Sequence, residues 1–350
     1  MMIAPIQWKE DTLYLLDQRL LPLEEKVIAV RNIEEAYQAI KEMVVRGAPC
    51  IGFTGILGLA LWLKSHPQFI ISEFEMAAQY LNSSRPTAVN LGFEIDRTVN
   101  LVKENYKNGF STVYKKVVEF GLEQILLSEK RNHQMADFVI ADLTKRYGQK
   151  KLTVMTHCNT GYLACGSLGT ALGVISKLHS LGRIEHVYAD ETRPYMQGSR
   201  LTAYELGKEA IPHSVVVEGA ASYIMSHHKI DAIFVGADRI VKNGDTANKV
   251  GTSTLSIVAK HFQVPFYVVA PTSSFDMKMK EGKEIEIELR DPKEILEYKE
   301  HRIAPQNSKA LNPSFDVTDH QFITGIACEK GLSLYPFMDL EKIVTGLESL

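Results

Sequence analysis

The sequence is poor in cysteine and has little net charge, and each shortage argues against a class of protein. Its 350 residues include four cysteines, Cys50, Cys158, Cys165 and Cys328, none of which form a C-x-x-C pair. We therefore expect no disulfide framework, and a reducing cytoplasm fits best. The formal net charge is −3, so no strong basic field exists to hold nucleic acid or an anionic membrane.

A leader and a membrane span are also not expected. The first residues, MMIAPIQWKEDTLYLL, lack a basic segment followed by a long apolar core, so we see no signal peptide. The most apolar N-terminal window, IGFTGILGLALWL at 51–63, is shorter than the roughly 20 residues that a spanning helix needs. We expect a buried helix there and no membrane partner.

The motifs of nucleotide, metal and serine-hydrolase sites are absent. The sequence contains no G-x-x-x-x-G-K-[ST], no H-E-x-x-H and no G-x-S-x-G. Gly166, Gly169 and Gly173 fall inside an expected helix, where close packing is the better explanation. His157 and Cys158 are adjacent, so on a strand their side chains would point to opposite faces. The sequence therefore predicts no metal site and no dinucleotide site.

What is present is the composition of a globular protein, with 45% hydrophobic and 23% charged residues. The length favours two domains. The apolar spacing predicts a mainly helical N-terminal domain, residues 1–147, that begins with two short strands within 10–31. Its helices are expected at 33–46, 51–63, 73–81, 88–108 and 111–147.

From residue 148 onward, short apolar strands alternate with helical segments, which predicts an α/β domain over 148–350. The strands are expected at 152–156, 186–190, 214–218, 232–236 and 265–271. The helices are expected at 162–179, 198–209, 220–228 and 250–262. This alternation is typical of a doubly wound parallel sheet. The tail, 272–350, should pack back on the sheet.

Polar, glycine-containing segments follow three of these strands. They are THCNTG (156–161), DETRPYMQGSR (190–200) and GADRIVKNGDTANKVGT (236–252). In open parallel sheets, ligands bind beyond the carboxyl ends of the strands. The pattern therefore predicts a functional site where these three segments converge.

Cys158 has two interpretations. Free cysteine is among the most buried residue types, so a core thiol is the simpler one. However, Cys158 lies at a strand end beside Asn159 and Gly161, where a following helix would direct its N-terminus at the thiol and lower the thiol pKa. We favour a functional role, although the sequence alone does not name it.

Asp238 and Lys249 also have competing interpretations. Asp238 follows an apolar strand, where partial desolvation would raise the pKa of its carboxyl and suit acid–base chemistry. The alternatives are a salt bridge to Arg239 or a helix cap. Asn248 and Lys249 could bind an anion at a helix start, or Lys249 could be a solvated loop lysine.

Two arginines in the N-terminal half precede helices. Arg46 comes before Gly47, Ala48 and Pro49, and Pro49 suits a first helical position. Backbone N–H groups beside an arginine make a good phosphate pocket. Arg85 in SRPTAVN has the same context, a loop that leads into a helix.

Taken together, six ordered segments resemble the methylthioribose-1-phosphate isomerase family, and the similarity covers nearly the whole chain. Its wider superfamily includes other pentose-1-phosphate isomerases and regulatory subunits of an initiation-factor exchange factor. The segments are RGAP-IG (46–52), SRPTAVNL (84–91), THCN-G (156–161), ETRP--QGSRLTAYEL (191–206), VGADRI--NGD-ANK-GT (235–252) and NP-FDVT (312–318). The resemblance implies a helical N-terminal domain followed by a Rossmann-like domain, in agreement with the pattern above.

By motif, the resemblance places the catalytic cysteine at Cys158 and the catalytic acid at Asp238. Its substrate-binding positions fall on Arg46, Gly47, Ala48, Arg85, Gln197, Asn248 and Lys249. Two departures lie beside the site, because Cys50 stands where alanine is more frequent and Thr160 where THCNAG is usual. They leave the chemistry intact and bear on substrate preference.

The implied reaction converts an aldose phosphate to a ketose phosphate without a cofactor, and the implied assembly is a homodimer. Asp238, protonated through burial, would donate to the ring oxygen, and Cys158 would move the C2 proton to C1; a C2-to-C1 hydride shift is the competing route. A 5-deoxyribose-1-phosphate isomerase and a non-catalytic regulatory subunit are the alternative functions.

Overall fold

The structure is a computed structural model that describes residues 3–86, 89–298 and 301–346. The chain divides into two compact units. Unit 1 comprises residues 1–132 and 160–169, and unit 2 comprises residues 133–159 and 170–350. The domain boundary expected at 147–148 coincides with the end of the long helix α5, Phe110–Tyr147, and stays a prediction.

Unit 1 is mainly helical after a short β start, as the sequence predicted. Three strands, not two, form an antiparallel sheet in the order β1-β2-β3. They are β1 (Ile6–Lys9), β2 (Thr12–Leu16) and β3 (Val27–Val30). The helices are α1 (Ile33–Lys41), α2 (Ala48–Ser65), α3 (Ile71–Asn82), α4 (Val89–Asn105), the first part of α5 and α6 (Tyr162–Cys165).

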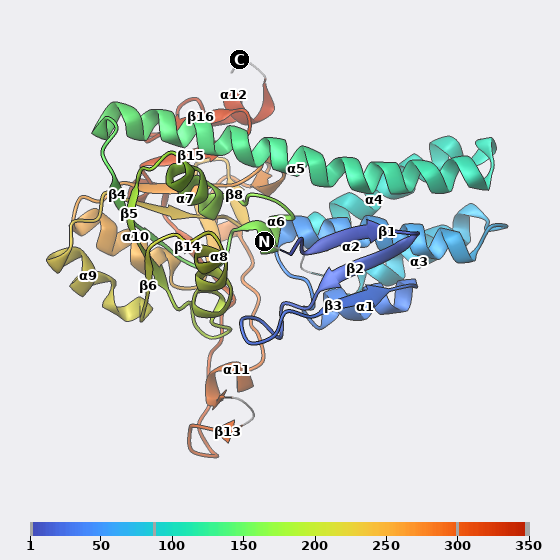
Figure 1. Cartoon of the computed structure of the whole chain (residues 1–350), viewed down its shortest axis with the longest axis horizontal. Helices are drawn as coiled ribbons and strands as arrows, with labels where there is room; N and C mark the ends of the chain where they lie inside the picture. The colour runs from blue at the N-terminus through green and yellow to red at the C-terminus, as the bar shows by residue number, and fades with distance from the viewer. Residues whose placement is uncertain (1–2, 87–88, 299–300, 347–350) are drawn as a thin grey trace. The chain divides into compact units, whose positions relative to one another are not determined.

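Helix α2 forms the centre of the core of unit 1 (Figure 1). All fourteen residues from Cys50 to Leu63 are buried, because the helix is apolar on every side and packs against α1, α3 and α4. It is longer than the window at 51–63 predicted, and by length and composition alone it could cross a membrane. Since 78% of its 18 residues are buried inside the protein, the expected buried helix is confirmed.

Unit 2 contains the predicted parallel sheet. Seven strands lie in the order β16-β15-β10-β7-β4-β5-β6, and all pairs are parallel except β15 with β16. Their bounds are β4 (Leu152–Thr156), β5 (Ile184–Asp190), β6 (His213–Val216), β7 (Ala232–Val235), β10 (Phe266–Val269), β15 (Gly325–Cys328) and β16 (Gly331–Leu334). The tail supplies the last two strands and so packs back on the sheet, as expected.

Helices cover both faces of this sheet, so its strands read as continuous apolar runs. Successive side chains of a strand point to opposite faces of the sheet and pack in two separate cores. In β4, Val154 lies in one core and Met155 lies in the other. The end of α5 and α7 (Ala171–Ser180) contribute to the first core. The second core contains residues of α9 (Ala221–His227), α10 (Thr252–His261) and α12 (Leu340–Thr345).

The strand order reverses between β4 and β7. In chain order, the six parallel strands lie 3-2-1-4-5-6, the arrangement of dinucleotide-binding sheets, with β4 and β7 as the central neighbours. Helices that follow these two strands leave toward opposite faces, which opens a crevice at their carboxyl ends. This topological switch point is the place where open α/β sheets bind ligands.

The sequence missed a second sheet in unit 2, in the order β11-β8-β9-β14. Its strands are β11 (Phe275–Asp276), β8 (Arg239–Val241), β9 (Thr246–Lys249) and β14 (Phe315–Thr318). The segment 236–252 was expected to be a loop because its strands are only three and four residues long and β9 is mostly polar. In fact it forms a β8–β9 hairpin that continues from β7.

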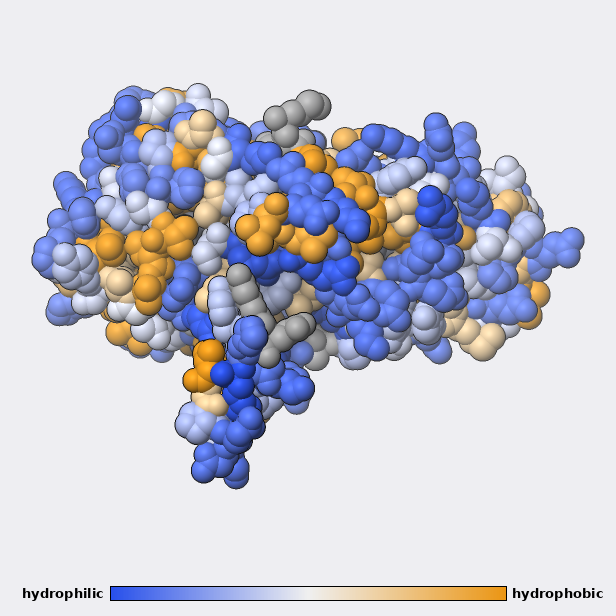
Figure 2. Space-filling view, turned by 60° about the horizontal axis from the view of Figure 1, so that its bottom comes forward, coloured by the Kyte–Doolittle hydropathy of each residue, from blue (hydrophilic) through white to orange (hydrophobic). Residues whose placement is uncertain are grey.

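An arm of residues 285–313 extends from unit 2 and carries α11 (Lys293–Leu296), β12 (Glu297–Tyr298) and β13 (His301–Arg302) (Figure 1). Its surface in Figure 2 is largely hydrophilic with a small apolar group. Leu289, Ile303 and Leu311 are exposed by 63%, 62% and 74%.

Candidate active site

Cys158 lies in a sharp turn two residues beyond β4. Its backbone has a φ of 64°, a left-handed conformation that a residue with a side chain adopts only when its surroundings impose it. Its N–H donates to Thr192 Oγ1 over 2.8 Å, and its carbonyl oxygen accepts from Thr202 Oγ1 over 2.6 Å. The residue is half-buried, so these two threonines hold a partly accessible thiol in place.

The helix expected at 162–179 is wrong, since α6 and α7 are separate. Gly166 and Gly169 have φ values of 79° and 94°, which end one helix before the next begins. The helix after Cys158 therefore has four residues and a small dipole, and the dipole argument for a lowered thiol pKa loses its support.

The side chain of Asn159 also holds the turn that follows β4. Its amide Nδ2 donates to Thr202 Oγ1 over 3.2 Å and to Glu205 Oε1 over 2.7 Å, and all three side chains are buried. The turn after β4 is thereby tied to the segment after β5.

The segment after β5 contains a second and a third left-handed residue, Thr192 with φ 61° and Met196 with φ 57°. It then enters a π-helical turn, Gly198–Thr202, which leads into α8, Ala203–Lys208. Gly198 is required there, because a Cβ on it would lie 1.6 Å from the carbonyl oxygen of Asp190. Strained backbone and π-helical turns gather at functional sites.

Gln197 is the residue of this segment that the resemblance assigned to substrate. Its side chain is 7% exposed. Among the residues that the structure describes, none donates a hydrogen bond to its buried Oε1. An unsatisfied buried acceptor costs about 1–3 kcal/mol, so this oxygen is suited to a donor from a ligand.

Asp238 lies between β7 and β8. Its N–H donates to the carbonyl oxygen of Ala247 over 2.9 Å, and the next residue, Arg239, pairs with Ala247 in the β8–β9 register. The residue is exposed, so the expectation of a partly desolvated carboxyl is wrong for this structure. Its neighbour Arg239 lies 3.8 Å from Asp276. The role of Asp238 as an acid stays a prediction.

Asn248 and Lys249 lie on β9 and not in a loop. Asn248 is buried and donates to Thr252 Oγ1 over 3.0 Å. Lys249 Nζ donates to the Ser314 carbonyl oxygen over 2.7 Å and lies 4.4 Å from the centroid of the Phe315 ring. The alternative of a solvated loop lysine is therefore wrong, whereas anion binding stays a prediction.

In unit 1, Arg46 and Gly47 lead into α2 as expected. Arg46 is buried, with 8% exposure. Gly47 is the N-cap with φ 89°, and a Cβ on it would approach Ala164 to 2.5 Å. A glycine is therefore needed to start this helix, whose first residue is Ala48.

Arg85 is the last predicted position of unit 1, and Cys50 is one of the two departures beside the predicted site. Cys50 is fully buried, and its thiol donates to the Leu163 carbonyl oxygen over 3.3 Å, so it packs as a core thiol. Arg85 is half-buried just beyond α3, and its N–H donates to the Asn82 carbonyl oxygen. Thr87 and Ala88 of the SRPTAVNL segment lie outside the described residues.

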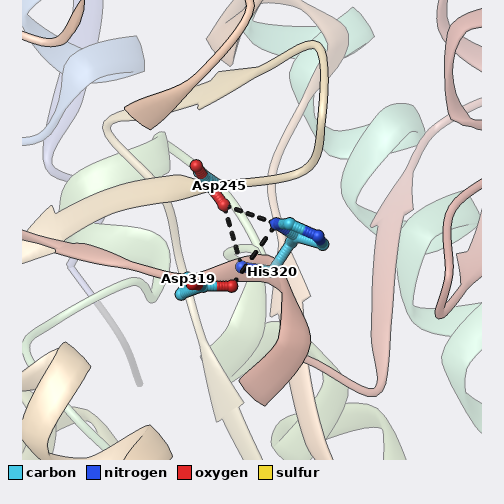
Figure 3. Close-up of side chains that lie close together, drawn as sticks. All are labelled: Asp245, Asp319 and His320. Atoms are coloured by element: carbon cyan, nitrogen blue, oxygen red, sulfur yellow. Dashed lines mark hydrogen bonds and ion pairs between the residues drawn. The ribbon is translucent and has the colours of Figure 1, made fainter. Parts of the chain in front are cut away.

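One cluster in the described part of the chain has the spacing of metal ligands. The ligand atoms of Asp245, Asp319 and His320 lie within 4.8 Å of one another (Figure 3). However, Asp245 Oδ1 accepts from the backbone N–H and the Nδ1 of His320, and Oδ2 accepts from Asn243 and Gly282. Burial opposes ionisation, but these donors lower the pKa of Asp245 overall. Hydrogen bonds account for the cluster without an ion.

Sequence reasoning missed the side chains that hold Cys158. Thr192 and Thr202 are in the segments quoted after β5, but neither has a spacing that identifies a partner 34 or 44 residues away. The sequence analysis also assigned no role to Asp190, which is buried at the end of β5.

Comparisons with known proteins show the family of the chain. The model of the initiation factor 2 subunit family matches residues 44–334. The chain belongs to this family. A methylthioribose-1-phosphate isomerase of Leptospira interrogans is 44% identical over 347 residues, covering 94% of each chain.

Two solved structures of the family resemble the whole chain. A 5-methylthioribose 1-phosphate isomerase from Pyrococcus horikoshii has a TM-score of 0.91 and 37% identity, covering 99% of this chain and 97% of that one. A translation initiation factor eIF-2B delta subunit from A. fulgidus has a TM-score of 0.87 and 35% identity, covering 98% and 99%. The α/β fold class is confirmed.

Proposed function

We propose that this protein is an aldose–ketose isomerase of methionine salvage that converts 5-methylthioribose 1-phosphate to 5-methylthioribulose 1-phosphate. Relatives similar over nearly the full chain carry that name. The observation that carries the proposal is topological: Cys158 and Asp238 follow β4 and β7, the two strands at the switch point of the sheet.

We propose that Asp238 and Cys158 act in sequence. Phosphate on the anomeric oxygen prevents simple opening of the sugar to a free aldehyde, so the ring oxygen must gain a proton as its bond to C1 breaks. Asp238 would donate that proton, and the bound sugar would cover the exposed carboxyl group and favour its neutral form. Cys158 would then take the proton from C2 and return it to C1, and the C2 hydroxyl would give its proton back to Asp238 as it becomes the ketone carbonyl. The substrate and product are isomers, so no redox cofactor is required.

The remaining predicted positions would bind the sugar phosphate. In unit 2, Gln197 Oε1 would accept from a sugar hydroxyl, and Asn248 and Lys249 would donate to oxygens of the substrate. In unit 1, Arg46, Arg85 and the N–H groups of Gly47 and Ala48 would bind phosphate.

We also propose that the protein works as a cytoplasmic homodimer. None of the four cysteines forms a disulfide, which suits a reducing compartment. Sedimentation equilibrium would test the dimer, and a single species of monomer mass at micromolar concentration would contradict it.

The test is an NMR assay of the purified, EDTA-treated protein on 5-methylthioribose 1-phosphate and 5-deoxyribose 1-phosphate, side by side. We expect turnover of both and a higher kcat/KM for the methylthio substrate. Equal values would indicate a broader pentose-1-phosphate isomerase, because an apolar pocket discriminates a small group by only about 1–3 kcal/mol.

The alternative of a non-catalytic regulatory subunit rests on the 35% identity to the eIF-2B delta structure. That function requires neither Cys158 nor Asp238. If the folded protein turns over neither sugar phosphate, the isomerase proposal is overturned and the regulatory one takes its place.

A further inference from the structure

The proposed chemistry does not use His157, the residue before Cys158, although its imidazole is fully buried. Nδ1 lies 3.0 Å from Asp190 Oδ2, and Nε2 lies 2.9 Å from the carbonyl oxygen of Val250. A carbonyl oxygen can only accept, so Nε2 carries a proton. The ring therefore joins the ends of β4 and β5 to the segment between β9 and α10.

The surroundings of this ring favour a second proton. Burial alone would lower the pKa of His157, but the hydrogen bond and charge of Asp190, the charge of Glu218 and the Val250 carbonyl raise it above the ordinary value. Asp316, which accepts from the N–H groups of Gly251 and Ser253, adds a further carboxyl group near the ring.

The ring has no room to turn. A Cβ on Gly251 would lie 2.7 Å from His157 Cε1, so the glycine backbone packs directly on the imidazole. Glu218 approaches the same glycine, and its Oε2 accepts from the Arg193 N–H over 3.0 Å. The orientation of the imidazole is thus fixed by packing as well as by two hydrogen bonds.

A short path connects Asp190 to the backbone of Cys158. The Asp190 carboxylate accepts from His157, while its carbonyl oxygen accepts from Thr192 Oγ1 over 3.1 Å. The same Oγ1 accepts the Cys158 N–H over 2.8 Å. Residues 157 and 158 are therefore bound to residues 190 and 192 at two adjacent points, around a turn in which Cys158 and Thr192 both have positive φ.

We propose that His157 is a positioning residue for Cys158: hydrogen-bonded to Asp190 and to the Val250 carbonyl, it holds the turn after β4 in the left-handed conformation that places the thiol. The effect on turnover rests on the proposed isomerase function, whereas the effect on the turn does not.

Three variants test this role. In His157→Asn the amide can replace Nδ1 and bond Asp190, whereas in His157→Gln it can replace Nε2 and bond Val250. Because the path to Cys158 runs through Asp190, we expect His157→Gln to lose about 100-fold in kcat, the size of effect that a 1 Å misplacement produces, with KM nearly unchanged. We expect His157→Asn to lose clearly less. His186→Gln, a half-buried histidine bonded to Ser214 on the same sheet, is the control and should behave as wild type.

Hydrogen exchange measured by mass spectrometry gives a readout without substrate. In His157→Gln we expect faster exchange in peptides covering 156–161 and 190–198, with the strands of the sheet unchanged. If the wild type has no isomerase activity but exchange follows this pattern, the positioning role stands and the proposed function fails. Wild-type exchange in His157→Gln, equal losses in the Asn and Gln variants, or faster exchange across all of unit 2 would each overturn the role.

Discussion

The core around α2 in unit 1 and the carboxyl edge of the sheet in unit 2 both contain buried residues, but of opposite kinds. Of the fourteen buried residues from Cys50 to Leu63 in α2, Thr54 is the only one with a hydroxyl, and it donates to its own helix at the Cys50 carbonyl oxygen. The sheet edge instead buries His157, Asn159 and Asp190. The first kind of burial stabilises the chain, and the second fixes the positions of the segments that follow β4 and β5.

The physical reason is that hydrogen bonds depend on direction, whereas apolar burial does not. Apolar burial contributes roughly 25 cal/mol per Å² whichever neighbour covers the surface, so the α2 core tolerates adjustment. A buried polar group costs about 1–3 kcal/mol when its partner is missing, so His157 and Asn159 accept few arrangements. The sheet edge therefore gains a defined geometry rather than a large stabilisation.

The largest effect that separates the two regions should come from Asp238→Asn. Because the residue is exposed, we expect the free energy of unfolding to stay within about 0.5 kcal/mol of wild type. Because the amide cannot donate a proton as an acid does, kcat should fall by about 10²–10⁴-fold. Denaturant unfolding and the NMR assay measure the two quantities, and near-normal turnover would remove Asp238 from the mechanism.

Leu57→Ala should give the opposite result in unit 1. Leu57 is fully buried in α2 and packs against Gly121 of α5, so its loss leaves a cavity. We expect the free energy of unfolding to drop by about 2–5 kcal/mol, with kcat of the folded enzyme unchanged. If kcat fell in proportion to stability, the separation between the two regions would not hold.

The smallest effect concerns pH. His157 has a raised pKa when folded, so its proton contributes stability that is fully present below about pH 6.5 and is lost as the pH rises through the folded pKa. The difference in unfolding free energy between wild type and His157→Gln should therefore shrink from pH 6 to pH 9. The exposed His227, changed to glutamine, is the control. A difference that is constant or grows with pH would show that His157 is neutral in the folded protein.

The same contrast explains what could be predicted from sequence. The buried helix 51–63 and the strands from 152–156 to 265–271 were found because apolar periodicity is a local signal. The expectation that Cys158 and Asp238 follow strands of one parallel sheet is met, since β4 and β7 are neighbours, whereas the site at this edge stays a prediction.

The errors arose where local patterns carry no information about distant partners. The run 162–179 is helical in composition but is broken at Gly166 and Gly169, whose φ values no apolar pattern reveals. The short strands β8 and β9 form because they pair with each other and with β11 and β14. Likewise, the partners of His157 lie 33 and 93 residues away in sequence.

The most direct test of the account is the turnover of 5-methylthioribose 1-phosphate by Cys158→Ser. The substitution exchanges one atom at the switch point of the sheet, and Cys328→Ala, which removes a buried thiol from β15, is the matched control. We predict that Cys158→Ser unfolds as wild type does but loses at least about 100-fold in kcat, whereas folded Cys328→Ala keeps its activity. Wild-type turnover by Cys158→Ser would contradict the assignment of the catalytic site.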